Sequence, residues 1–591
     1  MKELEYPYKR EYILAKKKKL RNELMKGSSF LSVKIAILAG STVNEIKDIL
    51  ELFLLNVGIK PEFYLSEYNK YYEDAVFENE KLSKFKPDIV YIFTTYRNIN
   101  FDFDISTEVD EINDALKKDF YKYEKIWQSL KEKYNPVIIQ NNFEYPEYRL
   151  LGNKDISDYH GFSNYLMRLN DKFYQYANAN KNFYICDINY ISANYGLDKW
   201  HNEKLYALYK IPCDLFATPD ISYNVANIIK SIYGKNQKSL ILDLDNTLWG
   251  GVISEDGISK LNIGMETAEG EIYLSFQKYL EKLKSLGIIL NVVSKNDEDI
   301  AIDGIENTDG VLKKDDFLFI NANWEPKHKN IIDISKKMNI GLDAFAFVDD
   351  NPMERDIVKT NLPQVKVADV DLVEDYIKVI DKASYFELTN YTAEDRDKLS
   401  TYKSNILREK LAEEIIDYNE YLKSLCMSAE IKEFSEKYYE RISQLSNKSN
   451  QFNLTTKRYT INDIEEISND RNYITLYGKL ADKFGDNGIV SIFIGKIDKD
   501  VLSIELFLMS CRVLKRKMEF AMMDEIVSVV KSKNVNKIVG HYYKTEKNNM
   551  VKDLFLDFGF TKVSESENGD SKWELKDLPN YQNLCDVIKI N

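Results

Sequence analysis

Short apolar runs alternate with helical patterns from residue 33 to residue 236. The first run, Val33–Ala39, is rich in isoleucine and precedes Gly40-Ser41-Thr42 and a helical pattern over Asn44–Val57. Strands that alternate with helices form a parallel sheet, so we expect an α/β domain over residues 33–236. The further strands that we expect there are Asp88–Thr94, Val137–Gln140 and Phe183–Ile188.

A helical pattern without strands precedes this domain. Residues 1–30 are rich in Lys, Glu, Leu and Tyr at helical spacing and end at Gly27-Ser28-Ser29. Because glycine commonly ends a helix, we expect a helical arm over residues 1–32. The sequence leaves open whether the arm is used for self-association or for docking.

A second alternation of strands and helices predicts another α/β domain over residues 237–383. Its first strand is the apolar run that ends in Leu242-Asp243-Leu244-Asp245. Parallel sheets are again expected from strands that are separated by helices. The other predicted strands are Ile288–Ser294, Phe317–Ile320 and Ala344–Val348.

The rest of the chain changes pattern twice. Residues 384–425 are densely charged at helical spacing, which predicts a helical connector. Residues 426–591 predict an α+β domain, so the whole chain is expected to be a multidomain protein of α/β class. This domain is expected to contain strands at Cys426–Phe434, Tyr473–Leu480, Ile489–Ile497, Leu502–Met509 and Lys537–Tyr543, helices near residues 515–531 and 549–557, and a final strand.

Composition narrows the classes of protein that the chain can represent. The 591 residues carry 81 Lys and Arg against 95 Asp and Glu, a net charge of −14, which gives nucleic acid and anionic membranes no general attraction. The 5 cysteines are scattered and form no C-x-x-C pair, which argues against a disulfide framework or a zinc site. No apolar run approaches the ~18 residues that span a bilayer, and no signal peptide is evident. We therefore expect a cytoplasmic protein without nucleic-acid or membrane partners.

The strongest chemical signal is a set of polar residues at the ends of successive predicted strands. Asp243 and Asp245 follow the first strand of the second α/β domain. The others, in chain order, are Ser294, Lys327 and the pair Asp349-Asp350. The carboxyl ends of parallel strands meet at one edge of a sheet, where open α/β sheets bind their ligands. Each residue alone has an ordinary structural explanation, but the ordered set predicts a site.

Phosphoryl transfer is the chemistry that suits this set, because it needs positioning and neutralisation of charge. We assign Asp243 as the nucleophile and Asp245 as the acid and then the base. Ser294 and Lys327 are assigned to hold the phosphoryl group. Asp349, with Asp243 and a backbone carbonyl, is expected to hold Mg²⁺, and Asp245 and Asp350 complete the predicted metal ligands. Thr247 and Asn296 are predicted to contact the substrate.

The second α/β domain and the last domain contain longer strings of residues that resemble those of a known family. The segment resembles the haloacid-dehalogenase superfamily of aspartate-nucleophile phosphatases, and its strings are similar to those of the FkbH-like branch. Only 48 residues separate Asp245 from Ser294, so a capless domain is implied. The strings are DLDNTLWGGVISEDG (Asp243–Gly257), SKND (Ser294–Asp297), NANWEPK (Asn321–Lys327), FVDDNPMER (Phe347–Arg355), NKSNQFNLTTKRY (Asn447–Tyr459), DKFGDNGIV (Asp482–Val490) and SCRVLKRKME (Ser510–Glu519).

The first α/β domain is similar in order to the SGNH hydrolases. Ser41 follows the first strand, and Asp198 and His201 form an Asp-x-x-His pair near the end of the domain. The resemblance implies that His201 lies beside Ser41 and is oriented by Asp198. The alternative is a binding or docking module without catalysis, because Gly40 stands where an Asp precedes Ser in that family.

The last domain resembles the GNAT acyltransferases in its order of elements. In that fold the loop after the fourth strand binds the pyrophosphate of coenzyme A. Here that loop carries Arg512, Lys515 and Lys517, which predicts a grip on the phosphate of a phosphopantetheine arm or of the substrate. Cys511 lies at the strand end beside Arg512, a position that favours a thiolate able to accept an acyl group. The alternative for Cys511 is a small buried residue.

The resemblance implies a bifunctional glyceryltransferase and phosphatase. Such an enzyme takes a phosphoglyceryl group from 1,3-bisphosphoglycerate, removes phosphate with Mg²⁺, and loads the acyl unit onto an acyl carrier protein. The order of the steps, the final acceptor and the oligomeric state stay open. The enzymatic alternative is a Mg²⁺-dependent phosphatase of a phosphosugar or phosphoprotein with the flanking domains as binding adaptors, and the non-enzymatic one is a scaffold.

Overall fold

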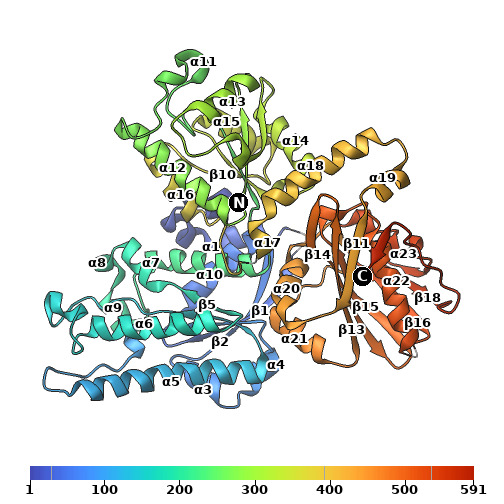
Figure 1. Ribbon diagram of the computed structural model, residues 1–591. Coiled ribbons are helices and arrows are strands. Elements are labelled where there is room, and N and C mark those ends of the chain that lie inside the picture. Colours follow the sequence, from blue (N-terminus) through green and yellow to red (C-terminus); the bar gives the residue numbers. More distant parts are fainter. Residues whose placement is uncertain (28–29, 392, 534) are drawn as a thin grey trace. The chain divides into compact units, whose positions relative to one another are not determined.

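The computed structural model describes residues 1–27, 30–391, 393–533 and 535–591. It contains two compact units, Met1–Ile232 and Tyr233–Asn591 (Figure 1). The first unit thus ends four residues before the expected boundary at residue 236. The predicted end of the arm at Gly27-Ser28-Ser29 falls partly on Ser28 and Ser29, which lie outside the described residues. In the part of the chain that the structure describes, no helix is both long and apolar enough to cross a membrane.

The first unit is built on a five-stranded parallel sheet in the order β2-β1-β3-β4-β5. One strand, β2, escaped the sequence pattern because Lys60 and Glu62 interrupt it and Pro61 lies within it. Proline is tolerated in a strand at the edge of a sheet, which is where β2 lies. The strands are β1 (Leu31–Ala39), β2 (Ile59–Leu65), β3 (Ile89–Phe93), β4 (Val137–Asn141) and β5 (Phe183–Cys186).

Helices cover this first sheet. The helices α5 (Val109–Tyr134) and α6 (Phe162–Ala179) bury their apolar stripes against alternate residues of β1, β3 and β4. A second group is formed by α1 (Arg10–Leu24), α2 (Asn44–Asn56) and α10 (Thr218–Ile232), which contact one another. The predicted helical arm is therefore α1, and it packs within the first unit through ion pairs such as Lys17 with Glu45 at 2.6 Å.

The second unit begins with another parallel sheet, in the order β10-β9-β6-β7-β8. Its strands are β6 (Ser239–Leu242), β7 (Ile289–Ser294), β8 (Phe317–Ala322), β9 (Phe345–Val348) and β10 (Lys366–Val367). The described segment between β6 and β7 holds the short α11 (Ile253–Asp256), one 3₁₀ turn (Ile258–Lys260) and α12 (Ala268–Ser285). The capless α/β fold predicted from the spacing is confirmed. The other helices around this sheet are α13 (Glu298–Asn307), α14 (Lys327–Met338), α15 (Pro352–Asn361) and α16 (Tyr376–Lys382).

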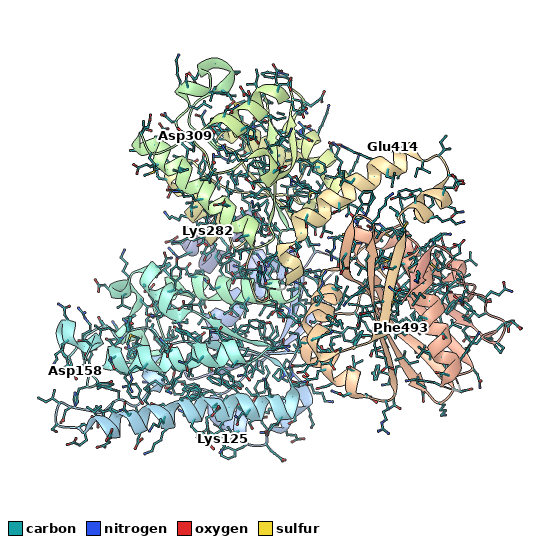
Figure 2. The ribbon with its side chains drawn as sticks, in the orientation of Figure 1. Lys125, Asp158, Lys282, Asp309, Glu414 and Phe493 are labelled. Atoms are coloured by element: carbon teal, nitrogen blue, oxygen red, sulfur yellow. The ribbon has the colours of Figure 1, made fainter. Side chains whose placement is uncertain are left out.

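The connector is helical, as predicted, and leads to a nine-stranded mixed sheet. It consists of α17 (Ala393–Arg396), α18 (Lys398–Glu414), which Figure 2 marks at Glu414, and α19 (Tyr418–Ser424). The sheet runs β17-β18-β16-β15-β14-β13-β11-β19, with β12 paired to β15. Its strands are β11 (Met427–Glu433), β12 (Phe452–Asn453), β13 (Tyr473–Asp482), β14 (Gly485–Asp498), β15 (Val501–Met509), β16 (Lys537–Tyr542), β17 (Thr561–Glu565), β18 (Ser571–Leu575) and β19 (Ile588–Ile590).

Helices pack on both faces of this last sheet. The helix α22 (Met518–Ser532) and the short α23 (Leu554–Asp557) contribute to one apolar cluster, which includes Phe493 of β14 (Figure 2). The helices α20 (Tyr439–Lys448) and α21 (Ile461–Asn469) contribute to the other cluster. These last two helices were not predicted from the sequence.

Candidate active site at the carboxyl edge of the second sheet

Four segments bring polar side chains to one edge of the sheet in the second unit. Asp243 follows β6, and Ser294 is the last residue of β7. Lys327 is the first residue of α14, and Asp349 directly follows β9. Because β6, β7, β8 and β9 are all parallel neighbours, the residues that follow them lie at the same edge.

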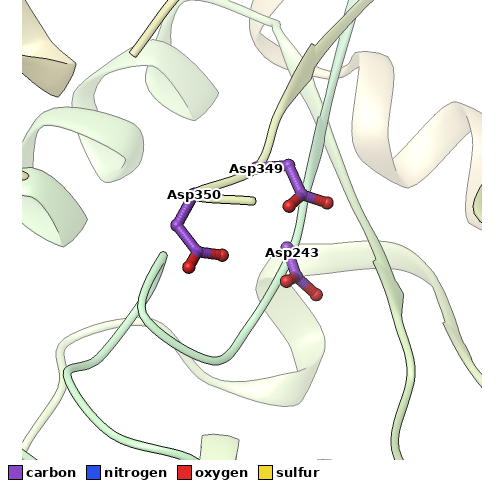
Figure 3. Close-up of side chains that lie close together, drawn as sticks. All are labelled: Asp243, Asp349 and Asp350. Atoms are coloured by element: carbon purple, nitrogen blue, oxygen red, sulfur yellow. The ribbon is translucent and has the colours of Figure 1, made fainter. Parts of the chain in front are cut away.

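Three carboxylates lie together at this edge (Figure 3), and the ammonium group of Lys327 pairs with two of them. Asp243, Asp349 and Asp350 each offer a carboxylate oxygen, and these oxygens lie within 4.8 Å of one another. The Lys327 Nζ lies 2.9 Å from Asp243 Oδ2 and 2.6 Å from Asp349 Oδ2. Lys327, Asp243 and Asp349 are all buried, so their charges are poorly screened.

The pKa shifts follow from this crowding of charge. Burial, followed by the charge of Asp243, raises the pKa of Asp349 to about 7. The same two causes raise the pKa of Asp350. Burial alone lowers the pKa of Lys327, but the charges of Asp243 and Asp349 outweigh it and raise that pKa. The site thus holds more negative charge than Lys327 offsets, and a further cation stabilises it.

One buried oxygen in the centre has no partner. Asp243 Oδ1 makes no hydrogen bond to any described residue, whereas Oδ2 pairs with Lys327. Asp243, Asp349 and Asp350 together offer carboxylate oxygens, which are the ligands that hard divalent cations prefer, and Asp243 Oδ1 is unpaired. The residues present therefore fit Mg²⁺, with Asp243, Asp349 and Asp350 as its side-chain ligands.

Asp245 is not among these ligands, which corrects the prediction that its carboxylate binds the metal. Its Oδ1 accepts hydrogen bonds from Trp249 Nε1 at 3.0 Å and from the backbone N–H of Ile253 at 3.1 Å. Its Oδ2 accepts one from Asn296 Nδ2 at 2.8 Å. These three donors fix the Asp245 carboxylate, and Oδ2, with one donor, keeps a second lone pair for a further partner.

Asn296 and Ser294 lie together beside Asp245. The Asn296 amide that bonds Asp245 also lies 3.2 Å from Ser294 Oγ, and both Asn296 and Ser294 are buried. The structure therefore brings Asp243, Asp245, Ser294 and Lys327 to one edge, with Asn296 linking two of them.

Thr247 holds the loop that carries Asp350 through a hydrogen bond. Its side chain is fully buried, and its hydroxyl accepts a hydrogen bond from the backbone N–H of Asp350 at 3.2 Å. The structure thus shows Thr247 in contact with the loop that carries Asp350, and its contact with substrate stays a prediction.

Arg355 and Trp249 are functional positions that sequence reasoning missed. Arg355 Nη1 donates to the backbone carbonyls of Asp349 at 2.9 Å and of Asp350 at 2.7 Å, which fixes the turn after β9. Trp249 instead donates from its indole Nε1 to the side-chain carboxylate of Asp245. Both lie within the strings FVDDNPMER and DLDNTLWGG, but those letters do not show that the side chains return to the neighbouring loop.

The SGNH-like arrangement is not formed in the first unit. His201 Nε2 lies 3.0 Å from the backbone carbonyl of Tyr145, and neither His201 Nδ1 nor Ser41 Oγ has a hydrogen-bond partner among the described residues. Asp198 is exposed on α8 (Leu197–Trp200). The prediction that Asp198 orients His201 beside Ser41 is therefore wrong, since the bond to Tyr145 already fixes the imidazole.

Cys511 lies near the C-terminal end of α14, whereas Lys327 of the candidate active site lies at the N-terminal end of that helix. Asn339, which follows α14, donates from Nδ2 to the Cys511 carbonyl at 3.5 Å, and the Cys511 side chain packs with the apolar cluster of the second sheet. The 12 residues of α14 span about 18 Å, and Lys327 is at its other end. The structure does not bring Cys511 together with Asp243.

The side chains of the cationic loop after β15 contact neighbouring residues of the second unit. Lys517 Nζ lies 3.3 Å from Asp586 Oδ1, and Arg512 Nε lies 3.3 Å from Ser510 Oγ. Lys515 is exposed, and its backbone carbonyl accepts a hydrogen bond from Tyr418. Of the three predicted phosphate contacts, Lys515 is thus the most available to a ligand.

Comparison with known proteins gives one family match and one structural likeness. The family model of the FkbH N-terminal domain matches residues 34–230. The solved N-terminal part of the protein BF1531 from Bacteroides fragilis, which contains a phosphatase domain complexed with Mg, is 29% identical and has a TM-score of 0.59. That likeness covers 64% of this chain and 99% of the solved one.

Weaker likenesses concern about a quarter of the chain. The ribosomal-protein-S18-alanine N-acetyltransferase of Escherichia coli is 9% identical, has a TM-score of 0.19, and covers 25% of this chain and 90% of its own. Ard1 from Thermoplasma volcanium is 18% identical, with a TM-score of 0.20 and coverage of 25% and 97%. A search of curated proteins gave no significant match. Residues 34–230 thus match the FkbH N-terminal domain, and the FkbH-like resemblance expected from the motifs is confirmed.

Proposed function

We propose that this chain is a Mg²⁺-dependent phosphatase of the aspartyl-phosphate type that also loads a glyceryl group onto an acyl carrier protein. The observation that carries the phosphatase half is the unpaired, buried Asp243 Oδ1 beside Lys327, Asp349 and Asp350. The related Bacteroides protein, whose solved structure contains a phosphatase domain complexed with Mg, supports the same activity and the same metal.

The residues divide the phosphatase reaction into two steps. Asp243 Oδ1 attacks phosphorus, a bond between Oδ1 and phosphorus forms, and the bond to the leaving oxygen breaks. Asp245 gives its proton to that oxygen, and then accepts a proton from the water that attacks phosphorus and regenerates Asp243. Lys327 and Ser294 hold the phosphoryl oxygens. Mg²⁺, when bound, supplies positive charge that offsets the developing negative charge.

The transfer half is supported by the resemblance and by the chemistry of the substrate class. The acyl phosphate of 1,3-bisphosphoglycerate is activated, so a phosphopantetheine thiol can attack its carbonyl carbon, form a thioester and expel phosphate. The remaining phosphate ester then requires the Asp243 site. Because Cys511 and Asp243 lie at opposite ends of α14, a group held on Cys511 does not reach Asp243, which favours a mobile carrier arm for this substrate.

The second candidate is a phosphatase of a phosphosugar or phosphoprotein whose flanking domains only bind. The packing of Cys511 against the apolar cluster of the second sheet favours it, because such packing is the ordinary role of a small half-buried cysteine. Under this alternative no carrier protein is needed.

Intact-protein mass spectrometry separates the two candidates. The chain is mixed with Mg²⁺, 1,3-bisphosphoglycerate generated in situ and a holo acyl carrier protein, and the masses of both proteins are followed. The proposal predicts a glyceryl adduct on the carrier, and phosphate release without any adduct would favour the plain phosphatase. In the same assay Cys511→Ala is expected to block loading if Cys511 relays the acyl group, while phosphate release is kept. Loading at the wild-type rate would return Cys511 to a packing role.

A further inference from the structure

One tryptophan of the chain is exposed to solvent, and it lies in a loop of the second unit. Trp324, between β8 and α14, is 68% exposed. The chain has 5 tryptophans, all within its described residues, and the other four are at most 2% exposed. A large apolar ring in water gains free energy when another molecule covers it, so Trp324 is available for contact with a ligand. The four buried tryptophans are Trp127, Trp200, Trp249 and Trp573.

The exposed ring of Trp324 is held in place by the loop that follows β7. Its indole Nε1 donates to Asp297 Oδ1 at 3.1 Å. Next to it in the chain, the backbone N–H of Asn323 donates to the carbonyl of Ser294 at 3.1 Å. Because these bonds already restrict the side chain and its loop, contact with a ligand costs little further conformational entropy.

Trp324 lies beside the phosphatase residues. It precedes Lys327 by three residues, which limits the distance between their Cα atoms to at most about 11 Å. Its partner Asp297 follows Ser294 by three residues. The two loops that hold the ring are therefore the loops that carry the two groups assigned to the phosphoryl oxygens.

The leaving group of a phosphate ester points toward this rim. In-line displacement places the leaving oxygen opposite the attacking Asp243 Oδ1. Asp243 is buried, so a leaving group extends from it toward the open carboxyl edge of the sheet. The domain is capless, and the exposed side chains at that edge are the ones that meet the leaving group.

A second exposed apolar side chain lies on the other side of β6. Met353 is 71% exposed and belongs to the first turn of α15, which follows β9. The sheet order β10-β9-β6-β7-β8 places Asp243, after β6, between the loops that carry Met353 and Trp324. Methionine adapts its shape to different partners, whereas the tethered indole presents a fixed planar face. Trp324 is thus the better candidate for selecting a substrate.

We propose that Trp324 is a specificity-determining residue of the phosphatase site, and that its ring stacks on a planar group in the leaving group of the phosphate ester. The role rests on the phosphatase activity proposed above and adds the class of substrate to it. Aromatic rings and amides are both planar groups that stack on an indole face. Esters whose leaving group is a small polyol lack such a group and do not use this contact.

Steady-state kinetics with Mg²⁺ test the role. The substrates are phenyl phosphate, with an aromatic leaving group, 4′-phosphopantetheine, with amides, and glycerol 2-phosphate, with neither. Trp324→Ala is expected to raise KM for at least one planar ester by about tenfold, with kcat within about twofold. Both constants for glycerol 2-phosphate are expected to stay within about twofold. The planar ester with the larger change in KM identifies the kind of planar group.

Two further variants separate the contact from general damage. Trp324→Phe keeps a planar ring and is expected to retain KM within about threefold for the planar esters. Tyr543→Ala removes an exposed aromatic ring of the last sheet and is the matched control, with kinetics like those of the wild type. Equal changes for all three esters in Trp324→Ala, or no change for any, would overturn the role of Trp324 while phosphate release by the wild type upheld the phosphatase.

Fluorescence supplies a readout that needs no turnover. Because the other tryptophans are buried, quenching by acrylamide reports mainly on Trp324, and Trp324→Phe verifies this assignment. In Asp243→Asn, one of the planar esters is expected to reduce quenching about twofold in a saturable manner, whereas inorganic phosphate, which has no leaving group, is not. If the wild type released no phosphate from any ester, the proposed phosphatase would fail, and quenching would still decide whether the ring contacts a planar ester. Equal quenching with both planar esters and with phosphate would overturn the contact.

Discussion

In the phosphatase centre, Asp243 and Asp245 differ in the hydrogen bonds that their carboxylates accept, and this difference suits them to different chemical roles. Asp243 keeps Oδ1 unpaired, whereas three N–H groups hold Asp245. Two carboxylates in different surroundings can therefore serve as nucleophile and as acid–base group within one site.

The replacement Asp245→Asn tests this division. An amide cannot protonate the leaving oxygen or activate water, so turnover is expected to fall by about 10²–10⁴-fold. With an activated substrate such as acetyl phosphate the first step still proceeds, and a phosphorylated enzyme is expected to accumulate in intact-mass spectra after acid quench. The exposed Glu325→Gln, in the NANWEPK loop, is the control and should behave as the wild type. Loss of turnover without any adduct would mean that Asp245 acts before the attack of Asp243.

Glu144 is fully buried in the first unit, and this burial gives a prediction about pH and stability. Its pKa is about 7 in the folded chain and about 4.3 in an unfolded one, so the folded state binds the proton more tightly. The contribution of Glu144 to stability is therefore complete below about pH 4 and falls as the pH rises to about 7. Glu144→Gln removes this loss, so the thermal midpoint of the variant relative to the wild type is expected to rise between about pH 5 and about pH 8. The full loss is on the order of 3 kcal/mol, and an unchanged difference would show that Glu144 is not buried as described.

The sequence predicted the reacting residues of the phosphatase centre better than the hydrogen bonds that hold these residues in place. Asp243, Ser294, Lys327 and Asp349 follow predicted strands, and parallel topology alone brings such residues together. The role of Asp245 away from the metal could not be predicted, because its donors include a backbone N–H whose direction depends on the fold of the loop after β6.

Secondary-structure elements in the second unit are joined by a buried charge cluster. On α18, Arg408 pairs with Asp482 at the end of β13, with Nη2 to Oδ1 at 2.7 Å, and Arg516 lies 3.4 Å from the other oxygen. Burial lowers the pKa of Arg516 to about 10. The connector thereby contacts both the last sheet and the loop that precedes α22.

Replacement of the shared acid should cost more than replacement of one base. Asp482→Asn leaves two buried guanidinium groups uncompensated and is expected to destabilise the chain by about 3–5 kcal/mol. Arg408→Met leaves Asp482 paired with Arg516 and is expected to cost less. The thermal midpoints of the two variants give the order, with Lys403→Met as the control because its pair with Asp315 is exposed. The reverse order would contradict the shared role of Asp482.

Elements were predictable where their patterns were strong. Central strands such as β1 and β6 are continuous apolar runs and were predicted nearly to their bounds. The edge strand β2 was missed because it carries charged residues and Pro61. The helices α20 and α21 were missed because their apolar residues are recognised as a buried face only through their packing on the last sheet.

At the scale of the whole molecule, the phosphatase residues all belong to the unit Tyr233–Asn591. We therefore expect a fragment of residues 233–591 to release phosphate within about threefold of the full chain, since no group from the first unit takes part in the proposed steps. Release is compared at equal Mg²⁺, with the thermal midpoint of the fragment as the check on folding. A folded fragment that released no phosphate would show that the first unit completes the site.

The most direct test of the account is phosphate release by the wild type, Asp243→Asn and Glu325→Gln, with and without Mg²⁺, using acetyl phosphate and p-nitrophenyl phosphate. We predict release by the wild type and Glu325→Gln only with Mg²⁺, and a loss of more than about 10³-fold in Asp243→Asn. Release by Asp243→Asn at the wild-type rate would contradict the assignment of Asp243 as the nucleophile.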